Sequence, residues 1–327
     1  MKRRAFITLL GGAAAWPLAT RAQRRDRVRG IGVLMAWSEG DADGASYLEA
    51  FHRELTRLGW SDGGNARIDQ RWTGNFDSIR MYADELVRLQ PDVIVAITTA
   101  AVLALQKETR TIPIVFASVG DPVGLGLVAS LARPGANITG FAHAEGEIAG
   151  KWLELIKESA PDLRRAAIMF NPDFQPAQYT LGTTFQAAAK ALSVEPIMAP
   201  VRNDAEIEAA IEALGRERGG LVVATDAFLS AHRENIIANA DRSRVPAISN
   251  DVHFVKQGGL FVYVERYVDM FRGAAGYVDR ILKGEKASDL PIQLPTKYEF
   301  QINLRTAKAL DLTVPPILQA TADEVME

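Results

Sequence analysis

The chain has 327 residues, no cysteine and a formal net charge of −3 at pH 7. This length is sufficient for two domains with separate hydrophobic cores, and the lack of cysteine excludes disulfide bonds and thiolate catalysis. The slightly acidic balance argues against nucleic acid as a partner, because a phosphate backbone requires a basic surface.

The first residues have the three parts of a secretory signal peptide. Lys2-Arg3-Arg4 is positively charged, residues 6–18 form an apolar run, and small or polar residues follow as far as Ala22. The apolar run is too short to span a bilayer, and the paired arginines followed by Ala-Phe-Ile match a twin-arginine export signal. We expect a signal peptide at 1–22 and a mature protein in a bacterial periplasm, soluble after cleavage. The alternative is a frayed N-terminal helix of a cytoplasmic protein.

Short apolar segments alternate with amphipathic ones from Gly30 onward. The spacing of Leu48, Phe51 and Leu55 predicts a helix over 46–58. Strands are predicted at 30–35, 68–72, 92–97 and 112–117, and another helix at 78–89. Continuous apolar strands separated by helices are typical of a parallel sheet covered on both faces.

A second series of the same kind begins after Gly140. It predicts a helix at 147–159, which stops before Pro161, and a buried strand at 165–170. Strands are then predicted at 194–199, 221–225, 245–248 and 259–264, helices at 270–282 and 304–310, and an extended segment at 291–295.

This order of elements predicts an α/β fold of two Rossmann-like lobes with parallel sheets. The helix and the extended segment near the C-terminus would let the chain recross between the lobes, and several crossings at one waist make a hinge. We expect lobe 1 to comprise 28–140 and 264–289, and lobe 2 to comprise 141–263 and 290–327.

Polar and aromatic residues stand at the predicted strand ends. Ligands of open parallel sheets bind outside the carboxyl ends of the strands, beside helix N-termini. Hydroxyl, amide, carboxylate and aromatic groups suit a small polar ligand held by hydrogen bonds. The predicted ligand-binding residues are Trp37, Ser38, Thr98, Thr99, Asp121, Asn171, Asp226, Asn250, Asp251 and Tyr263.

Several of these residues also have a purely structural interpretation. Thr98, Asp226 and Asn250 stand where helix N-caps occur. Asp121 could cap a short helix over 124–131, because Pro and Gly follow it closely. Capping alone would account for these four residues.

The sequence constrains the chemistry of the ligand less than it constrains the position of the site. Trp37 would pack against the ligand or under its own lobe, and Asp226 or Asp251 is expected to face a cationic group. No arginine is evident at the strand ends, and Glu39 and Asp41 would repel a carboxylate. Backbone N–H groups at helix starts would have to bind a carboxylate, which favours an amine-bearing or neutral ligand.

No catalytic pattern stands out in the sequence. The four histidines have no metal-ligand spacing, and no HExxH, GxSxG or Walker sequence is present. We therefore expect no enzyme activity, no cofactor and no metal site.

Three segments resemble the ABC-transporter substrate-binding proteins of the tryptophan/tyrosine-type family: LQPDVIVAITTAAVLALQKETRTIPIVF (89–116), GDPVGLGLVASLARPGANITGF (120–141) and KWLELIKESAPDLRRAAIMFNPD (151–173). The resemblance extends along the mature chain and implies the type I periplasmic binding protein fold, with the ligand in the interlobe cleft. It also implies an ABC permease in the inner membrane as partner, and no catalysis. The residues that it implies in the cleft are Thr98, Thr99, Asp121, Asn171, Asp226 and Asp251.

The sequence therefore predicts the periplasmic solute-binding component of an ABC importer. Its ligand would be an amino acid or an aromatic or organic acid, and a monomer is expected because a two-lobe binder must open and close. Two alternatives stay open: a sensor that presents its ligand to a membrane receptor, and an exported enzyme.

Overall fold

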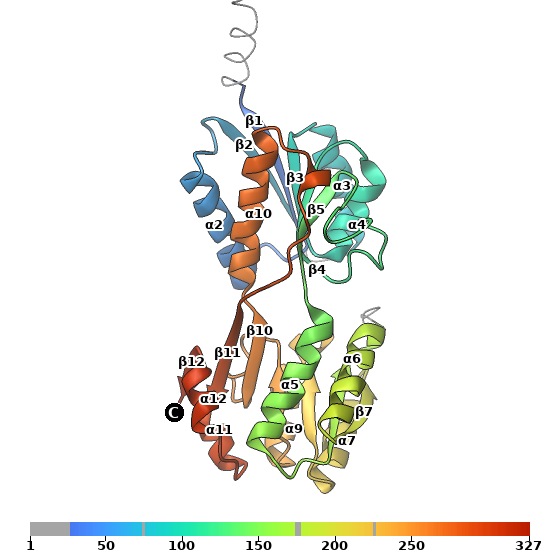
Figure 1. Cartoon of the computed structure of the whole chain (residues 1–327), viewed down its shortest axis with the longest axis vertical. Coiled ribbons are helices and arrows are strands. Elements are labelled where there is room, and N and C mark those ends of the chain that lie inside the picture. The colour runs from blue at the N-terminus through green and yellow to red at the C-terminus, as the bar shows by residue number, and fades with distance from the viewer. Residues whose placement is uncertain (1–26, 74–75, 174–177, 225–226) are drawn as a thin grey trace, which may run out of the picture. The chain divides into compact units, whose positions relative to one another are not determined.

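The computed structural model describes residues 27–73, 76–173, 178–224 and 227–327, and the predicted signal peptide lies outside them. The chain forms two compact units (Figure 1). Unit 1 runs to Ala142 and also includes Tyr267–Gln293, whereas unit 2 comprises His143–Arg266 and Leu294–Glu327. Along the described residues the chain passes between the units three times, after Ala142, Arg266 and Gln293.

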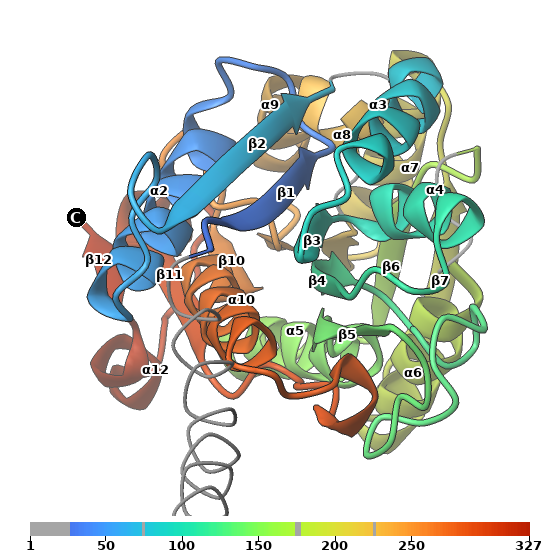
Figure 2. The same ribbon diagram turned by 90° about the horizontal axis from the view of Figure 1, so that it is seen from above.

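Unit 1 is built on a parallel sheet. Its described residues form five strands in the order β2-β1-β3-β4-β5, which Figure 2 shows from above. The strands are β1 (Arg29–Met35), β2 (Ala66–Trp72), β3 (Val93–Ile97), β4 (Ile114–Val119) and β5 (Ile138–Ala142). The helices are α2 (Ala42–Arg57), α3 (Phe76–Arg88), α4 (Thr99–Glu108) and α10 (Tyr267–Leu282).

Both faces of this sheet are covered by helices. Ile31 and Val33 of β1 belong to one buried cluster with α2 and α10, whereas Leu34 belongs to another with α3 and α4. The two clusters lie on opposite faces because successive side chains of a strand point to opposite sides. Figure 1 shows the same arrangement, with α2 and α10 on one side of the strands and α3 and α4 on the other. The predicted parallel sheet with two covered faces is confirmed for unit 1.

Unit 2 has a larger, mixed sheet. In the part of unit 2 that is described, seven strands follow the order β12-β11-β10-β9-β8-β6-β7. The strands are β6 (Arg165–Phe170), β7 (Glu195–Pro200), β8 (Gly220–Val223), β9 (Ala247–Ser249), β10 (Phe261–Glu265), β11 (Tyr298–Asn303) and β12 (Glu324–Met326). The helices are α5 (Glu145–Ser159), α6 (Gln178–Ala191), α7 (Asp204–Arg216), α8 (Ala227–Ala231), α9 (Arg233–Arg242), α11 (Leu304–Ala309) and α12 (Pro316–Thr321).

The sequence predicts a parallel sheet here too, and the sheet is parallel except for one pair of strands. Strand β11 pairs antiparallel with β10, with Tyr263 opposite Phe300. The chain returns to unit 2 after Gln293 and adds β11 and β12 to the edge formed by β10. The parallel pattern holds for β7, β6, β8, β9 and β10.

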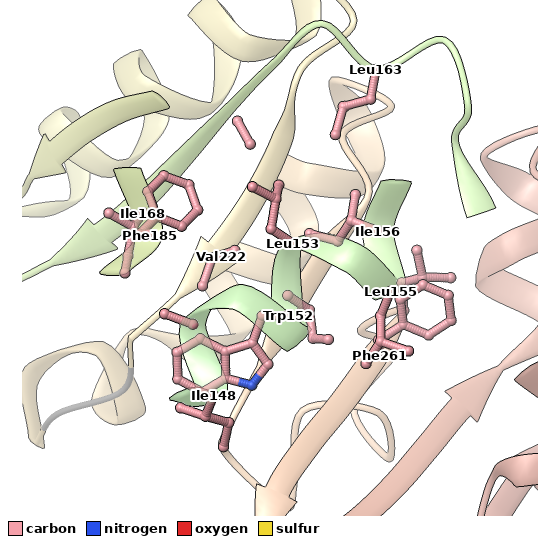
Figure 3. Packing of buried hydrophobic residues seen from close by; sticks show 14 of the residues in the cluster. Ile148, Trp152, Leu153, Leu155, Ile156, Leu163, Ile168, Phe185, Val222 and Phe261 are labelled. Atoms are coloured by element: carbon pink, nitrogen blue, oxygen red, sulfur yellow. The ribbon is translucent and has the colours of Figure 1, made fainter. Parts of the chain in front are cut away.

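The core of unit 2 is centred on α5. Figure 3 shows Trp152, Leu153 and Ile156 of this helix among side chains from the sheet and from α6. Trp152 is 2% exposed, and its Nε1 donates a hydrogen bond of 2.7 Å to the carbonyl of Tyr263. The indole therefore fills the core without leaving its N–H unsatisfied.

The breaks between the units fall slightly later than the lobe bounds expected from the sequence. Strand β5 extends to Ala142, and the ring of Phe141 packs 4.9 Å from that of Tyr277 within unit 1. Strand β10 continues to Glu265, and Leu290 and Ile292 are buried in the two clusters of unit 1. Apolar contact on each side of the connections, rather than the glycine at position 140, determines where a unit ends.

Gly140 provides a test of how closely two strands of unit 1 approach. It has a φ of +151°, and a Cβ there would lie 2.2 Å from the carbonyl oxygen of Phe116 in β4. We expect Gly140→Ala to lower the free energy of unfolding by about 3 kcal/mol, because backbone atoms of β4 would have to move. Denaturant unfolding followed by circular dichroism measures this loss.

Gly276 of α10 is the matched control, because a Cβ there meets no atom within 4 Å. We expect Gly276→Ala to raise stability by about 0.5–1 kcal/mol, since alanine has the higher helix propensity. Equal effects of the two substitutions would contradict the close approach of β5 to β4.

Candidate functional site

The strand order of each unit marks one point where its carboxyl edge can hold a ligand. In unit 1, β1 connects to β2 on one side, and the chain then continues with β3 on the other side of β1. In unit 2, β6 lies in the same way between β7 and β8. Where the strand order reverses, the connecting helices leave on opposite faces and open a crevice at the carboxyl ends. The candidate positions are the ends of β1 and β3 in unit 1, and of β6 and β8 in unit 2.

The predicted residues of unit 1 lie at this edge. Trp37 and Ser38 follow β1, Thr98 and Thr99 follow β3, and Asp121 follows β4. Because β1, β3 and β4 are adjacent and parallel, these five residues belong to neighbouring strand ends.

Thr98 has an unusual backbone conformation. Its φ is +82° and its ψ is 158°, and its side chain makes no capping hydrogen bond to α4 although it stands at the N-cap. Ser118 and Asp121, at the end of the neighbouring β4, also have positive φ, at 64° and 34°. Capping therefore does not account for Thr98, and strained residues of this kind cluster at functional sites.

The other non-glycine residues with positive φ in the described chain have an ordinary cause. They stand two residues after the ends of helices, in the left-handed conformation that ends many helices. They are Gln90, Ser193, Arg218, Arg244 and Asp311. The strain in unit 1 is thereby concentrated at the ends of β3 and β4.

Trp37 is packed by one face inside unit 1. Its ring is stacked on Phe271 of α10 at 6.2 Å and lies 5.7 Å from Tyr47 of α2. Tyr47 in turn is stacked on Tyr267 at 5.5 Å. Trp37 remains half-buried, so the end of β1 presents an aromatic surface that is already supported from behind. Tyr47 was not predicted from the sequence, although its helical spacing from Phe51 could have placed it on this side of α2.

Asp121 begins a turn and not a helix. Its Oδ1 accepts a hydrogen bond of 2.9 Å from the N–H of Gly124, and no helix forms over the described residues 124–131. The suggestion that Asp121 caps a helix there is wrong. The residue is exposed, and its side chain stabilises the turn at the end of β4.

The described predicted residues of unit 2 lie just after β6 and β9, except Tyr263, which lies in the middle of β10. Asn171 is 3% exposed, and its Oδ1 accepts the N–H of Asp173 at 2.8 Å. Asn250 follows β9 and is half-buried, whereas Asp226 lies outside the described residues. No helix begins after Asn250 in the described chain, so the N-cap interpretation of Asn250 is wrong.

Asp251 is engaged within unit 2. Its Oδ2 accepts a hydrogen bond of 2.6 Å from Nε of Arg233, and its Oδ1 accepts the N–H of His253 at 3.0 Å. The expected cationic group beside Asp251 is therefore present in the protein itself. Arg233 was not among the residues predicted from the sequence.

Tyr263 is stacked on Tyr298 of the adjacent β11. The two rings are 5.1 Å apart and nearly parallel, and Tyr263 remains half-buried. Burial raises the pKa of the Tyr263 phenol, and the Glu154 carboxylate raises it further. The hydroxyl therefore stays protonated at neutral pH and can donate a hydrogen bond.

Glu265 and His143 form a second polar group that sequence reasoning missed. Glu265, the last residue of β10, is 5% exposed and accepts the N–H of Ala144 at 2.7 Å and a hydrogen bond from Nδ1 of His143. A carboxylate that ends an apolar strand was the available signal, because such a group needs partners when it is buried.

The described residues were also searched for metal-binding groups and for membrane-spanning helices. They contain no group of three or more His, Cys, Asp or Glu side chains placed to hold a metal ion. None of their helices combines the length and apolar character needed to cross a membrane.

Comparison with known proteins identifies the family. Residues 37–326 match the family of ABC transporter substrate binding proteins. The chain belongs to this family. The resemblance found in the sequence is thus confirmed, and the two-lobed α/β fold is confirmed by solved structures of similar proteins.

Three known proteins are similar to this substrate-binding protein. The tyrosine-binding protein of Clostridioides difficile is 27% identical over 285 residues, which is 87% of this chain and 81% of the relative. A conserved domain protein of Vibrio cholerae is 26% identical with a TM-score of 0.79, covering 91% of this chain and 100% of that one. An ABC domain of Streptococcus pneumoniae in complex with L-Trp is 24% identical, also with a TM-score of 0.79, covering 91% and 99%.

Thr98 provides a test of strain at the candidate site. We expect Thr98→Gly to raise the free energy of unfolding by about 1 kcal/mol, because glycine adopts this conformation without strain and no capping bond is lost. Thermal unfolding measures the change. The same substitution at the exposed Thr111, whose φ is not positive, should lower stability by about 0.5–1 kcal/mol. A loss of stability in Thr98→Gly as large as that in Thr111→Gly would show that Thr98 is not strained.

Proposed function

We propose that this substrate-binding protein is the periplasmic component of an ABC importer and binds an amino acid, with aromatic amino acids as the preferred class. The observation that carries the proposal is the 27% identity to a tyrosine-binding protein along 87% of the chain. The half-buried rings of Trp37 and Tyr47 at a strand end of unit 1, which pack on the fully buried ring of Phe271, support an aromatic ligand.

We propose the strand ends of both units as ligand contacts, with the ligand in the interlobe cleft that the sequence predicts. In unit 1, Thr98 and Thr99 would offer hydroxyl and backbone N–H donors at the start of α4. The remaining proposed contacts are Trp37, Ser38, Asp121, Asn171, Asp226, Asn250 and Tyr263.

The proposed role in import also concerns the oligomeric state and the delivery of the ligand. The protein would act as a monomer, catalyse no reaction, need no cofactor and deliver its ligand to a permease in the inner membrane. The division into two units joined by three connections supports this role, because such connections can act as a hinge while the units keep their own cores.

Ligand binding can be tested by thermal unfolding of the purified protein with L-amino acids, aromatic acids and small organic acids. A ligand at about 100 times its Kd adds roughly 2.7 kcal/mol to the stability of the native state, which corresponds to a midpoint shift of several degrees. We expect the largest shifts with L-tyrosine or L-tryptophan. A panel without any shift, in protein shown by native mass spectrometry to be free of bound ligand, would contradict amino acid binding.

The aromatic surface gives a residue-level prediction. We expect Trp37→Ala to weaken the binding of aromatic amino acids about tenfold or more, because a central aromatic contact is lost, as measured by calorimetry. Trp60→Ala is the control, because Trp60 is also a half-buried tryptophan of unit 1 but lies between α2 and the start of β2, away from the carboxyl edge. Equal losses in the two variants would remove Trp37 from the proposed site.

The role in import needs a separate measurement. Uptake of the radiolabelled ligand by cells that lack the gene should fall and return with the wild-type gene. Binding in vitro with unchanged uptake would favour the sensor alternative.

A further inference from the structure

Arg233 and Asp251 form a largely buried ion pair at the carboxyl edge of unit 2. Nε of Arg233 donates to Oδ2 of Asp251 at 2.6 Å, and the two side chains are 17% and 7% exposed. Arg233 is the first residue of α9 and Asp251 follows β9. The pair therefore lies beside the point where the strand order reverses, on the same edge as the ends of β6 and β8.

Asp251 is fixed in place from several sides. Its Oδ1 accepts the N–H of His253 at 3.0 Å, and its own N–H donates to Oγ of Ser249 at 3.1 Å. Ser249 is the last residue of β9. The carboxylate is thus tied to the end of a central strand, and it fixes the guanidinium through Nε.

Arg233 keeps most of its hydrogen-bonding capacity. A guanidinium has five N–H donors, and among the described residues only Nε of Arg233 has a hydrogen-bond partner. Nη1 and Nη2 carry the remaining donors, in a planar fork that matches the two oxygens of a carboxylate. Because buried polar groups are generally paired, a largely buried arginine with an unused fork indicates a partner from outside the chain.

Other arginines around α9 have a different environment. Arg242, at the end of the same helix, pairs with Glu208 and is 60% exposed, and Arg244 pairs with Asp311 and is 70% exposed. Water can hydrate their free N–H groups. At Arg233, which is 17% exposed, water can provide little hydration.

We propose that Arg233 binds the α-carboxylate of the ligand through Nη1 and Nη2, with Asp251 as the residue that positions it. The inference deepens the proposed function and rests on it. It assigns the ligand's carboxylate to a side chain, where the sequence offered only backbone N–H groups, and an amino acid still carries the amine that the sequence favours. The sequence did not reveal this role because Arg233 lies within the connection between β8 and β9 and not at a strand end.

The test compares an amino acid with the amine that lacks its carboxylate. Calorimetry would measure the affinities of L-tyrosine and tyramine, and of L-tryptophan and tryptamine, for the wild-type protein and for Arg233→Gln. We expect Arg233→Gln to weaken amino acid binding about 10- to 100-fold, because charge-assisted hydrogen bonds to the carboxylate are lost. Amine binding should be unchanged. Arg233→Lys should recover only part of the loss, because it restores the charge without the fork.

Two further variants separate positioning from folding. Asp251→Asn should produce a smaller loss, about 3- to 10-fold, again only for the amino acids. Arg242→Gln is the matched control from the same helix and should change neither affinity. Thermal unfolding of each variant shows whether it folds. If Arg233→Gln does not fold, Arg233→Lys and Asp251→Asn still show whether affinity falls for the amino acid and not for the amine.

The outcomes distinguish this inference from the proposed function. Wild-type binding of an amino acid with an unchanged affinity in Arg233→Gln would overturn the role of Arg233 and leave the proposed function intact. Equal losses for amino acid and amine would show that the ion pair only supports the fold, and would also overturn it. Failure of the wild-type protein to bind any amino acid of the panel would overturn both.

Discussion

The parallel pairing of strands determines where chemistry can occur in this protein. In both units the first strand of the series, β1 or β6, receives its sequence neighbours on opposite sides, so the connecting helices depart on opposite faces. The strands themselves are apolar and buried, and polar side chains can collect only where they end. The candidate residues of each unit follow from this one topological feature.

The two units use their carboxyl edges differently. Unit 1 offers an aromatic surface and the start of α4, with strained backbone at Thr98 and Ser118. Unit 2 offers buried polar groups, because Arg233 with Asp251 and Glu265 with His143 lie at neighbouring strand ends. Buried polar and charged groups are costly unless they are paired, so the polar edge of unit 2 is held by the Arg233–Asp251 ion pair and the hydrogen bonds of Glu265, whereas that of unit 1 depends on packing and backbone conformation.

Much of the fold could be predicted because the buried strands are continuous apolar runs. This pattern predicts the segments 30–35, 92–97 and 165–170, and the order of the elements predicts the two lobes. Strand β5 was missed because Thr139 and Gly140 interrupt its apolar pattern. Strand β11 was missed although Tyr298–Asn303 alternates polar and apolar side chains, which is itself a strand signal.

From the sequence, the candidate site could be predicted only as a set of positions at strand ends. Reading the strand ends gave Thr98 and Asp251, but a sequence does not show that Thr98 has a positive φ or that Asp251 already has a cationic partner. The pairing of Arg233 with Asp251 depends on how α9 is rotated against the end of β9, and tertiary packing determines that rotation. The local sequence pattern therefore locates the carboxyl edge of each sheet. The conformation and partners of each side chain at that edge can be seen only in the structure.

Gly44 has a consequence for how the aromatic surface of unit 1 can change during evolution. A Cβ at Gly44 would lie 2.9 Å from Cε3 of Trp37 and 3.2 Å from Cζ3 of Trp72. A side chain at position 44 therefore requires the ring of Trp37 to shift or to be replaced, and exchange of Trp37 for a smaller residue removes the tighter of the two contacts. The order in which substitutions occur is thus constrained. A lineage that first replaces Trp37 by a smaller residue can then accept a side chain at position 44, near the start of α2, whereas a lineage that retains Trp37 cannot do so without moving its ring.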